Sequence, residues 1–286
     1  MKTFEFTQVD VFTSQKLEGN PLAVFHSGEG MTSEQMMAIA REMSLSETTF
    51  LFPPTLKADA KVRIFTVREE LPFAGHPTLG TAFVVAQSHP KQAEIRLEMK
   101  VGVIPVKVEK RADGTYFEMR QKDPVFGATY TDSAALAKAL GLAVSDLDSR
   151  YTPQVVSTGV AFLIVPLRSA HSLERLAPDF KLLGAELQKL NVHNAYFVVT
   201  GEGEIETRMF GANFEDPATG SAAGCAAAYL VRYKHRSPDA LFTMHQGRFV
   251  SRPSVIYAAA SLTGDNVTNV RVGGYVVEVL QGRLQL

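Results

Sequence analysis

Residues 62–75, VRIFTVREELPFAG, and residues 207–220, TRMFGANFEDPATG, are the two stretches that decide the fold. Aligned without a gap at an offset of 145, they share five identities in fourteen positions. The identical pairs are Arg63/Arg208, Phe65/Phe210, Glu70/Glu215, Pro72/Pro217 and Gly75/Gly220. Each stretch leads from a strand-like segment through a glycine-bearing turn into an apolar helix-like segment. The chain is therefore interpreted as a duplication of one structural unit.

The segments around the first stretch have the periodicities of strands and helices. Thr32 with Gln35 three residues later is typical of a capping box, and apolar residues then repeat at helical spacing up to Met43. The pattern predicts a further helix at 78–86 and strands near 4–6, 22–25, 50–52, 62–66, 95–99, 103–108 and 115–119.

The second half repeats this order of elements. After a predicted linker at 123–129, a helix at 133–140 ends at Gly141, a residue suited to a helix C-terminus. The pattern then predicts helical structure at 172–190 and 221–232 and strands at 162–165, 196–199 and up to Phe210.

The helix that follows each stretch is almost wholly apolar, and a helix that is apolar all round is buried. We therefore expect an α+β fold of two pseudo-symmetric halves, each with a sheet wrapped around one central helix. The expected halves are residues 1–123 and 124–269. Duplicated halves usually face each other, so both strand-to-helix junctions are expected at a shared cleft.

Composition narrows the class of partner. Hydrophobic residues make up 45% of the 286 and charged residues 21%, and the formal net charge is −1 with scattered basic residues. This argues against nucleic acid or a membrane surface as the partner and favours a small molecule. The chain shows no signal-peptide pattern and no apolar run long enough to span a membrane, so a cytoplasmic location is expected. Cys225 is the single cysteine, which excludes an internal disulfide and a mechanism that needs two thiols.

Both junctions are suited to binding an anion. The first backbone N–H groups of a helix have no partner within the helix and carry a partial positive charge. Such a helix start binds carboxylate or phosphate, and Gly75 and Gly220 let the backbone approach the ligand closely. The sequence therefore predicts a small anionic metabolite as the substrate.

The polar residues at the junctions are candidates for catalysis and substrate binding. They are His76 and Thr78 at the first junction, and Asp216, Thr219 and Ser221 at the second. Histidine has a pKa suited to proton transfer. On the residues alone, a purely structural His76 and helix-capping roles for Asp216 and Ser221 stay open.

Glu47 is a third candidate, because it stands directly before an apolar strand. Burial there would disfavour its charge and make it a capable acid/base near neutral pH. A solvent-exposed loop glutamate is the simpler interpretation and is favoured on the residues alone.

Four motifs carry a resemblance to a known family. They are VDVFTSQKLEGNPLAVF at 9–25, AREMSLSETTFL at 40–51, FTVREELPFAGHPTLGTA at 65–82 and GANFEDPATGSAAG at 211–224. In this order they closely resemble the PhzF family, named for an isomerase of phenazine biosynthesis. The resemblance covers essentially the whole chain.

The resemblance implies the diaminopimelate epimerase-like fold and an isomerase that needs neither metal nor organic cofactor. The member that gave the family its name isomerises a dihydro-hydroxyanthranilate by moving a proton between ring carbons. By motif, Glu47 corresponds to the general acid/base, and His76 and Asp216 to assisting groups. Ser221 and Gly220 correspond to the groups that hold the substrate carboxylate. The resemblance also implies a homodimer and a final segment, 270–286, that packs with the first half.

The chain departs from the wider superfamily, whose epimerases and racemases carry one cysteine at each junction. Cys225 lies inside the second helix and is interpreted as a packing residue. The seven histidines form no ligand-spaced cluster, and no nucleophile elbow, P-loop or dinucleotide fingerprint is present. Two alternatives stay open: an isomerase of a different small carboxylate, and a non-catalytic binding or interaction protein that keeps the fold and cleft.

Overall fold

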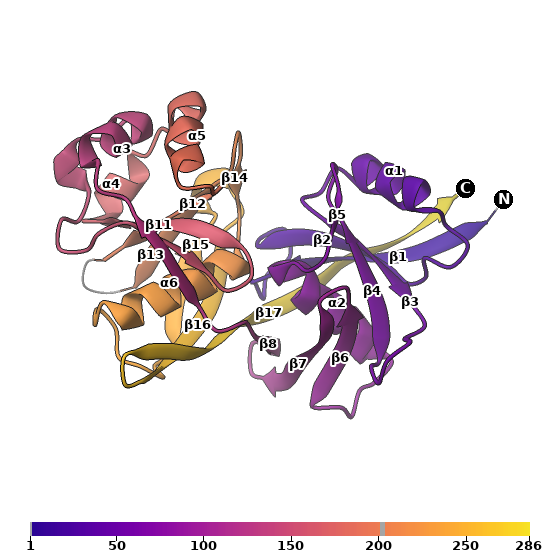
Figure 1. Cartoon of the computed structure of the whole chain (residues 1–286). Coiled ribbons are helices and arrows are strands. Elements are labelled where there is room, and N and C mark those ends of the chain that lie inside the picture. Colours follow the sequence, from indigo (N-terminus) through magenta and orange to yellow (C-terminus); the bar gives the residue numbers. More distant parts are fainter. Residues whose placement is uncertain (1, 201–203) are drawn as a thin grey trace. The chain divides into compact units, whose positions relative to one another are not determined.

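The computed structural model describes residues 2–200 and 204–286, which form two compact units (Figure 1). Unit 1 consists of Met1–Met119 and Gly273–Leu286, and unit 2 of Arg120–Val272. The long last strand, β17 (Asn266–Gln285), thus begins in unit 2 and ends in unit 1.

Unit 1 contains two helices and a set of mostly antiparallel strands. In chain order these are β1 (Thr3–Val11), β2 (Asn20–Phe25), α1 (Ser33–Met43), β3 (Thr48–Phe52), β4 (Ala60–Phe65), β5 (Glu70–Leu71), α2 (Gly75–Gln87), β6 (Glu94–Met99), β7 (Gly102–Arg111) and β8 (Gly114–Arg120).

Unit 2 repeats the order of unit 1, with additional helices. Its elements are β9 (Val125–Thr129), α3 (Ser133–Leu140), β10 (Gln154–Ser157), β11 (Ala161–Leu167), α4 (Ala170–Glu174), α5 (Phe180–Lys189), β12 (Ala195–Val199), β13 (Ile205–Phe210), β14 (Glu215–Asp216), α6 (Gly220–Arg232), β15 (Phe242–Gln246) and β16 (Ser254–Thr263).

The strand pairings confirm the duplication. In unit 1, β3 pairs parallel with β2 and antiparallel with β4, and β4 pairs antiparallel with β5 and parallel with β6. In unit 2, β12 pairs with β11 and β13, and β13 with β14 and β15, in the same senses. Even the register is shared, since Phe65 lies opposite Glu70 and Phe210 opposite Glu215.

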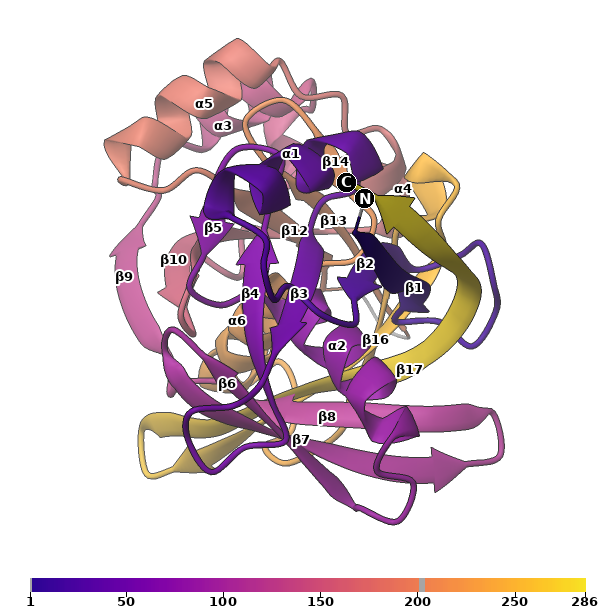
Figure 2. The same cartoon turned by 90° about the vertical axis from the view of Figure 1, so that its right-hand side faces the viewer.

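Each unit wraps its strands around one apolar helix, as the sequence predicts (Figures 1 and 2). In unit 1, α2 contacts β1, β2, β3, β6 and β7, and most of its residues are buried. In unit 2, α6 contacts β10, β11, β12 and β16, and is buried over most of its length. A Cβ on Gly80 would come within 2.9 Å of the Leu22 and Val11 side chains, so glycine allows α2 to lie close to the strands there.

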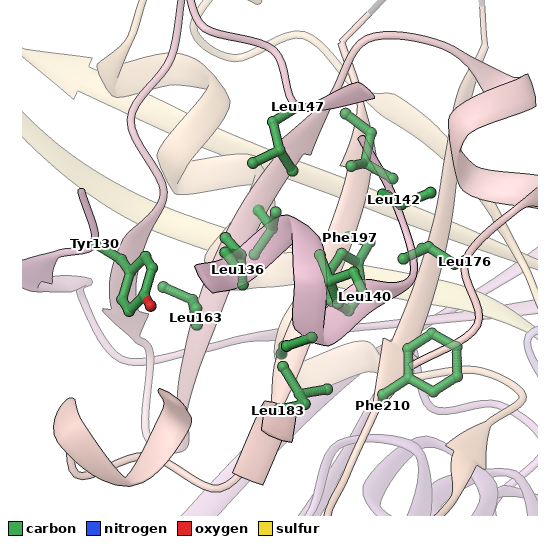
Figure 3. Packing of buried hydrophobic residues seen from close by; sticks show 14 of the residues in the cluster. Tyr130, Leu136, Leu140, Leu142, Leu147, Leu163, Leu176, Leu183, Phe197 and Phe210 are labelled. Atoms are coloured by element: carbon green, nitrogen blue, oxygen red, sulfur yellow. The ribbon is translucent and has the colours of Figure 1, made fainter. Parts of the chain in front are cut away.

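The remaining helices cover the outer faces of the strands. The apolar face of α1 contributes Met36, Ile39 and Ala40 to a core with Phe25 and Phe50. In unit 2, leucines of α3 and α5 form a second core against β11 and β12 (Figure 3). None of the helices within residues 2–200 and 204–286 has the length and apolar character to cross a bilayer.

One sequence-based expectation was wrong and another is refined by the structure. The expected linker at 123–129 contains strand β9, which pairs antiparallel with β10. The strand is mostly exposed, so it lacks the alternating apolar pattern on which recognition depends. The helical structure expected at 172–190 is present, as two helices, α4 and α5. Pro178 restricts Ala177 to non-helical conformations, and the Asp179 side chain then caps α5.

The two duplicated stretches fold into equivalent β-hairpins, each closed by a bidentate arginine–glutamate pair. Arg63 Nε and Nη2 donate to the two Glu70 carboxylate oxygens at 2.8 Å each. Arg208 donates to Glu215 in the same way at 2.8 and 2.7 Å. The Arg63 hydrogen bond lowers the pKa of the Glu70 carboxyl, which therefore stays ionised. Each pair fixes the chain shortly before the central helix begins.

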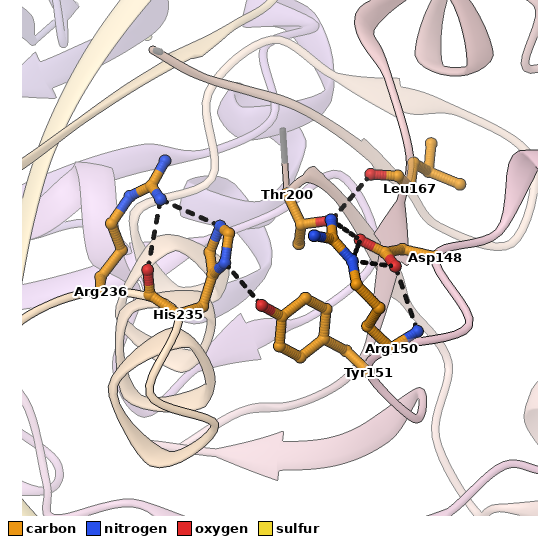
Figure 4. Close-up of polar contacts among 7 residues, drawn as sticks. All are labelled: Asp148, Arg150, Tyr151, Leu167, Thr200, His235 and Arg236. Carbon is orange, nitrogen blue, oxygen red and sulfur yellow. Dashed lines mark hydrogen bonds and ion pairs between the residues drawn. The ribbon is translucent and has the colours of Figure 1, made fainter. Parts of the chain in front are cut away.

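The far end of α6 is anchored by polar contacts (Figure 4). The Tyr229 hydroxyl donates to the Thr152 carbonyl oxygen at 2.7 Å. Just beyond the helix, His235 Nδ1 lies 2.9 Å from the Tyr151 hydroxyl, and Arg236 Nη1 donates to His235 Nε2 at 3.0 Å. These contacts fix the position of α6 along its axis within unit 2.

The two arginine–glutamate pairs differ in burial, which leads to a stability prediction. The side chains of Arg208 and Glu215 are 9% and 10% exposed, whereas those of Arg63 and Glu70 are 24% and 17% exposed. Removing one partner of a buried pair costs about 3–5 kcal/mol, and this cost falls toward about 1 kcal/mol as a pair becomes exposed to solvent. Arg208 also donates to the Leu173 and Leu176 carbonyl oxygens at 3.0 Å each, and Arg208→Leu removes these bonds too. We expect Arg208→Leu to lower the free energy of unfolding in urea by several times as much as Arg63→Leu. Equal losses would show that burial does not set the strength of these pairs.

Candidate active site

Glu47 stands between α1 and β3 in unit 1. Its side chain is 17% exposed, and its Oε2 atom is buried. The Glu47 Oε2 atom lies 3.4 Å from Nε2 of His76, a residue of the central helix α2. Glu47 thus faces the central helix, and the alternative of an exposed loop glutamate does not describe it.

His76 is the second residue of α2 and is only 6% exposed. Burial lowers the pKa of the imidazole to about 3, while a hydrogen bond to the Pro21 backbone opposes this shift. Proline has no N–H, so the ring must donate to the Pro21 carbonyl oxygen. His76 is therefore neutral near pH 7, with one ring nitrogen protonated.

Glu47 and His76 meet in unit 1. The Glu47 Oε2 and His76 Nε2 atoms lie 3.4 Å apart, which is longer than a well-formed hydrogen bond. Because Nε2 faces Glu47, we assign Nδ1 as the nitrogen that donates to Pro21. Nε2 then presents a lone pair to the carboxyl group.

Asp216 and Thr219 meet at the equivalent junction in unit 2. Asp216 ends the short strand β14 and is 9% exposed. Its Oδ2 atom accepts a 2.5 Å hydrogen bond from the Thr219 hydroxyl. Thr219 is the N-cap of α6, but its side chain makes no capping hydrogen bond.

Gly220 and Ser221 form the first turn of α6. The Gln121 side chain donates to the Gly220 carbonyl oxygen at 3.0 Å and accepts from the Thr158 hydroxyl at 2.7 Å. A Cβ on Gly224 would lie 1.9 Å from Gln121 Oε1, so a glycine one turn further along makes room for this contact. Ser221 is partly exposed, and its hydroxyl bonds to no side chain or backbone group in the described ranges.

The central helices differ from the outer helices at their N-termini. Side chains cap the four outer helices α1, α3, α4 and α5, through Thr32, Asp132, Ser169 and Asp179. The N-cap residues of α2 and α6, Ala74 and Thr219, make no side-chain capping hydrogen bond. These two helices therefore lack the acceptor that the outer helices obtain from their own N-cap residues, and the Thr219 N–H donates instead to Gln246 Oε1.

Gly75 and Thr78, the other two candidates at the first junction, both lie within α2. Gly75 is its first residue and is buried. The Thr78 hydroxyl donates back to the Ala74 carbonyl oxygen at 2.6 Å and is fully buried.

Sequence reasoning missed several residues that hold the site in place. The Gln246 side chain bonds to Asp216 and Thr219 from β15, and Gln121 holds the start of α6. These partners are 30 and 99 residues away in sequence, and no local pattern indicates them. Pro21 was visible as part of the motif at 9–25, but its role depends on the fold.

Neither a metal-binding cluster nor a thiol pair accompanies these residues. Within residues 2–200 and 204–286, no group of three or more His, Cys, Asp and Glu side chains could hold a metal ion. Burial raises the pKa of Cys225 to about 11, as expected for a packing residue. A cavity of about 270 Å³ lies at the other end of α6, beside Lys234, His235 and Arg236. None of the candidate site residues lines it.

Comparison with known sequences identifies the family. The profile of the family described as "Phenazine biosynthesis-like protein" matches residues 9–282. The trans-2,3-dihydro-3-hydroxyanthranilate isomerase of Pseudomonas aeruginosa is 36% identical, covering 98% of this chain and 99% of its own.

Comparison with solved structures supports the same conclusion. A PhzF-family protein of Bacillus anthracis superposes with a TM-score of 0.91 at 26% identity, with complete coverage of both chains. A hydroxyproline epimerase of Agrobacterium vitis has a TM-score of 0.67 at 13% identity, covering 99% of this chain and 92% of its own, which shows a shared fold alone. The predicted α+β, epimerase-like fold of two similar halves is thus confirmed. Together with the matched profile, these relatives place the chain in the phenazine biosynthesis-like (PhzF) family of isomerases.

Proposed function

We propose that this protein isomerises a small carboxylate-bearing metabolite by moving one proton between carbon atoms. Glu47 is the acid/base, His76 and Asp216 assist, and no metal or organic cofactor takes part. The observation that carries the proposal is the Glu47–His76 pair, a carboxyl group placed 3.4 Å from the lone pair of a neutral, buried imidazole.

This pair is suited to holding a single proton. If both groups are unprotonated, a carboxylate oxygen faces the Nε2 lone pair, and two acceptors repel each other. A proton on Glu47 removes the repulsion because the carboxylic acid can donate to Nε2. Glu47 can therefore release its proton to a substrate carbon and recover one from another carbon. A single base that takes up and returns a proton gives an isomerisation.

The second junction supplies groups for binding an anion. The uncapped start of α6 presents N–H groups beside the Ser221 hydroxyl. Backbone donors at a helix start favour a carboxylate, and they also stabilise negative charge that develops on the substrate during proton removal. We propose that Gly220 and Ser221 bind the substrate carboxylate there, and that Thr219 acts with them. At the first junction, Gly75 and Thr78 shape the backbone that approaches the substrate.

The relatives suggest which substrate to try first. Three matched isomerases from Pseudomonas species are named for trans-2,3-dihydro-3-hydroxyanthranilate. This compound carries a carboxylate and hydroxyl beside a π system, the features that the proposed groups would bind and activate. Sequence identities of 36–37% leave room for a different unsaturated or hydroxylated carboxylate. We further propose a homodimer that works in the cytoplasm.

Glu47→Gln tests the role of the carboxyl group. Trans-2,3-dihydro-3-hydroxyanthranilate and a panel of other small unsaturated or hydroxylated carboxylates are incubated in deuterated water, and their carbon-bound protons are followed by NMR. We expect deuterium incorporation or isomer formation with the wild type. The variant should be slower by roughly 10²–10⁴-fold, the usual contribution of a general acid–base group. Substrate affinity should change little, because glutamine keeps the size and polarity of the side chain.

Glu98→Gln is the matched control, since Glu98 is a buried glutamate of unit 1 that instead bonds to Thr55. Turnover should persist in this variant. Turnover that survives Glu47→Gln would remove Glu47 from the mechanism. Tight binding of a carboxylate with no exchange by the wild type would favour a non-catalytic binding protein.

The neutral state of His76 predicts a pH dependence. Its pKa is about 3 in the folded chain and near the ordinary 6.5 in the unfolded chain. Between these values the unfolded chain binds the extra proton, so the free energy of unfolding falls as the pH is lowered through this window. The slope from this residue is at most about 1.4 kcal/mol per pH unit. Urea unfolding at pH 7 and pH 5 should show a smaller pH dependence in His76→Gln than in the wild type. A His76 ring that titrates near pH 6.5 by NMR would contradict the assignment.

A further inference from the structure

Gln246, the last residue of β15, holds the turn that carries Asp216 through side-chain hydrogen bonds, an arrangement called the Gln246 clamp below. Its side chain is 3% exposed and makes four hydrogen bonds. Nε2 donates to the Asp216 carbonyl oxygen at 2.8 Å and to the Thr219 hydroxyl oxygen at 3.0 Å. Oε1 accepts from the Thr219 N–H at 3.2 Å and lies 3.2 Å from the Tyr196 hydroxyl. The amide thus uses its full hydrogen-bonding capacity on this turn and Tyr196.

The direction of these hydrogen bonds is fixed by their partners. The Asp216 carbonyl can only accept and the Thr219 N–H can only donate, so the Gln246 amide has one permitted orientation. The Thr219 oxygen then accepts from Gln246, and its single proton goes to Asp216 Oδ2 at 2.5 Å. Gln246 therefore donates to the Thr219 hydroxyl oxygen, and the Thr219 hydroxyl donates to the Asp216 carboxylate.

Tyr196 helps to hold the Gln246 side chain by donating a hydrogen bond to it. Burial raises the pKa of its phenol, so the hydroxyl keeps its proton. It shares this proton between Gln246 Oε1 and the Thr207 hydroxyl oxygen at 2.9 Å, and Thr207 donates onward to the His245 carbonyl oxygen. Nearby, Glu215 pairs with Arg208, and His245 Nε2 lies 3.0 Å from Glu204 Oε2. The Gln246 and Thr219 side chains that donate to this turn are a neutral amide and a neutral hydroxyl.

We propose that Gln246 is a positioning residue for the reaction. It fixes the Asp216–Thr219 turn and directs the Thr219 proton onto Asp216, so that Asp216 meets the substrate as a carboxylate in one orientation. The inference rests on the proposed function, because it takes Asp216 as a group that acts on the substrate. It adds a residue that no sequence motif of the chain contains.

Three variants separate positioning from packing. Gln246→Met keeps the volume and removes all four hydrogen bonds. Thr219→Val removes the hydroxyl that links Gln246 to Asp216, and Thr219→Ser keeps it. Gln154→Met is the matched control. Gln154 is an 8% exposed glutamine of the same unit, and its side chain bonds instead to Gly127 and Tyr233.

The kinetic result should differ between the variants. On whichever carboxylate the wild type turns over, we expect Gln246→Met and Thr219→Val to lower kcat roughly tenfold to a hundredfold, as misplacement of a reacting group does. KM should change less, and the acid limb of the pH profile should move to higher pH, because a carboxylate that loses a donor is protonated more readily. Thr219→Ser should restore most of the activity, and Gln154→Met should leave the pH profile unchanged.

A measurement without substrate separates this inference from the proposed function. The side-chain carboxyl carbon of Asp216, labelled with ¹³C and assigned with Asp216→Asn, is titrated by NMR. Its titration midpoint should move to higher pH in Gln246→Met and Thr219→Val, and not in Gln154→Met. An unchanged midpoint, or an equal change in Gln154→Met, overturns the positioning role. A shifted midpoint in a protein that turns over no carboxylate would support the clamp and count against the isomerase proposal alone.

Discussion

A bidentate arginine–glutamate pair in each duplicated hairpin is the shared constraint that fixes the chain just before each central helix. Arg63 with Glu70, and Arg208 with Glu215, join the two strands of a hairpin shortly before a buried helix begins. Planar two-point contacts of this kind fix distance and angle together. The helix that follows has its start determined by the hairpin, and its apolar surface then organises the strands around it.

The burial of the two central helices has a chemical consequence. A helix surrounded by strands must begin at the end of the hairpin that precedes it. In both units the N-cap residue of this helix makes no side-chain capping hydrogen bond. The donors left at such a start can bind an anion. The second residue of each helix is polar, His76 in α2 and Ser221 in α6, so equivalent positions of the two units carry an imidazole and a hydroxyl group.

Local patterns predicted most of the fold because the repeat places strong signals close together. The capping box of Thr32 and Gln35, the glycine end of α3 and the two apolar helices are all contained within short windows. Strand β9 was not predicted because it is exposed and has no apolar alternation, and its pairing partner β10 is about 30 positions away. The helical structure at 172–190 was predicted, and Pro178 divides it into α4 and α5.

The sequence by itself determined the duplication, the family and the identities of the polar residues at each junction, because these reside in motifs of contiguous residues. Only the tertiary structure decided the surroundings and hydrogen-bond partners of those residues. The neutrality of His76 follows from its burial, which outweighs the opposing effect of its bond to Pro21, and the turn at Asp216 is held by Gln246 from a distant strand. Protonation states and hydrogen-bond directions depend on desolvation and on partners distant in the chain, and neither is encoded in the spacing of neighbouring residues.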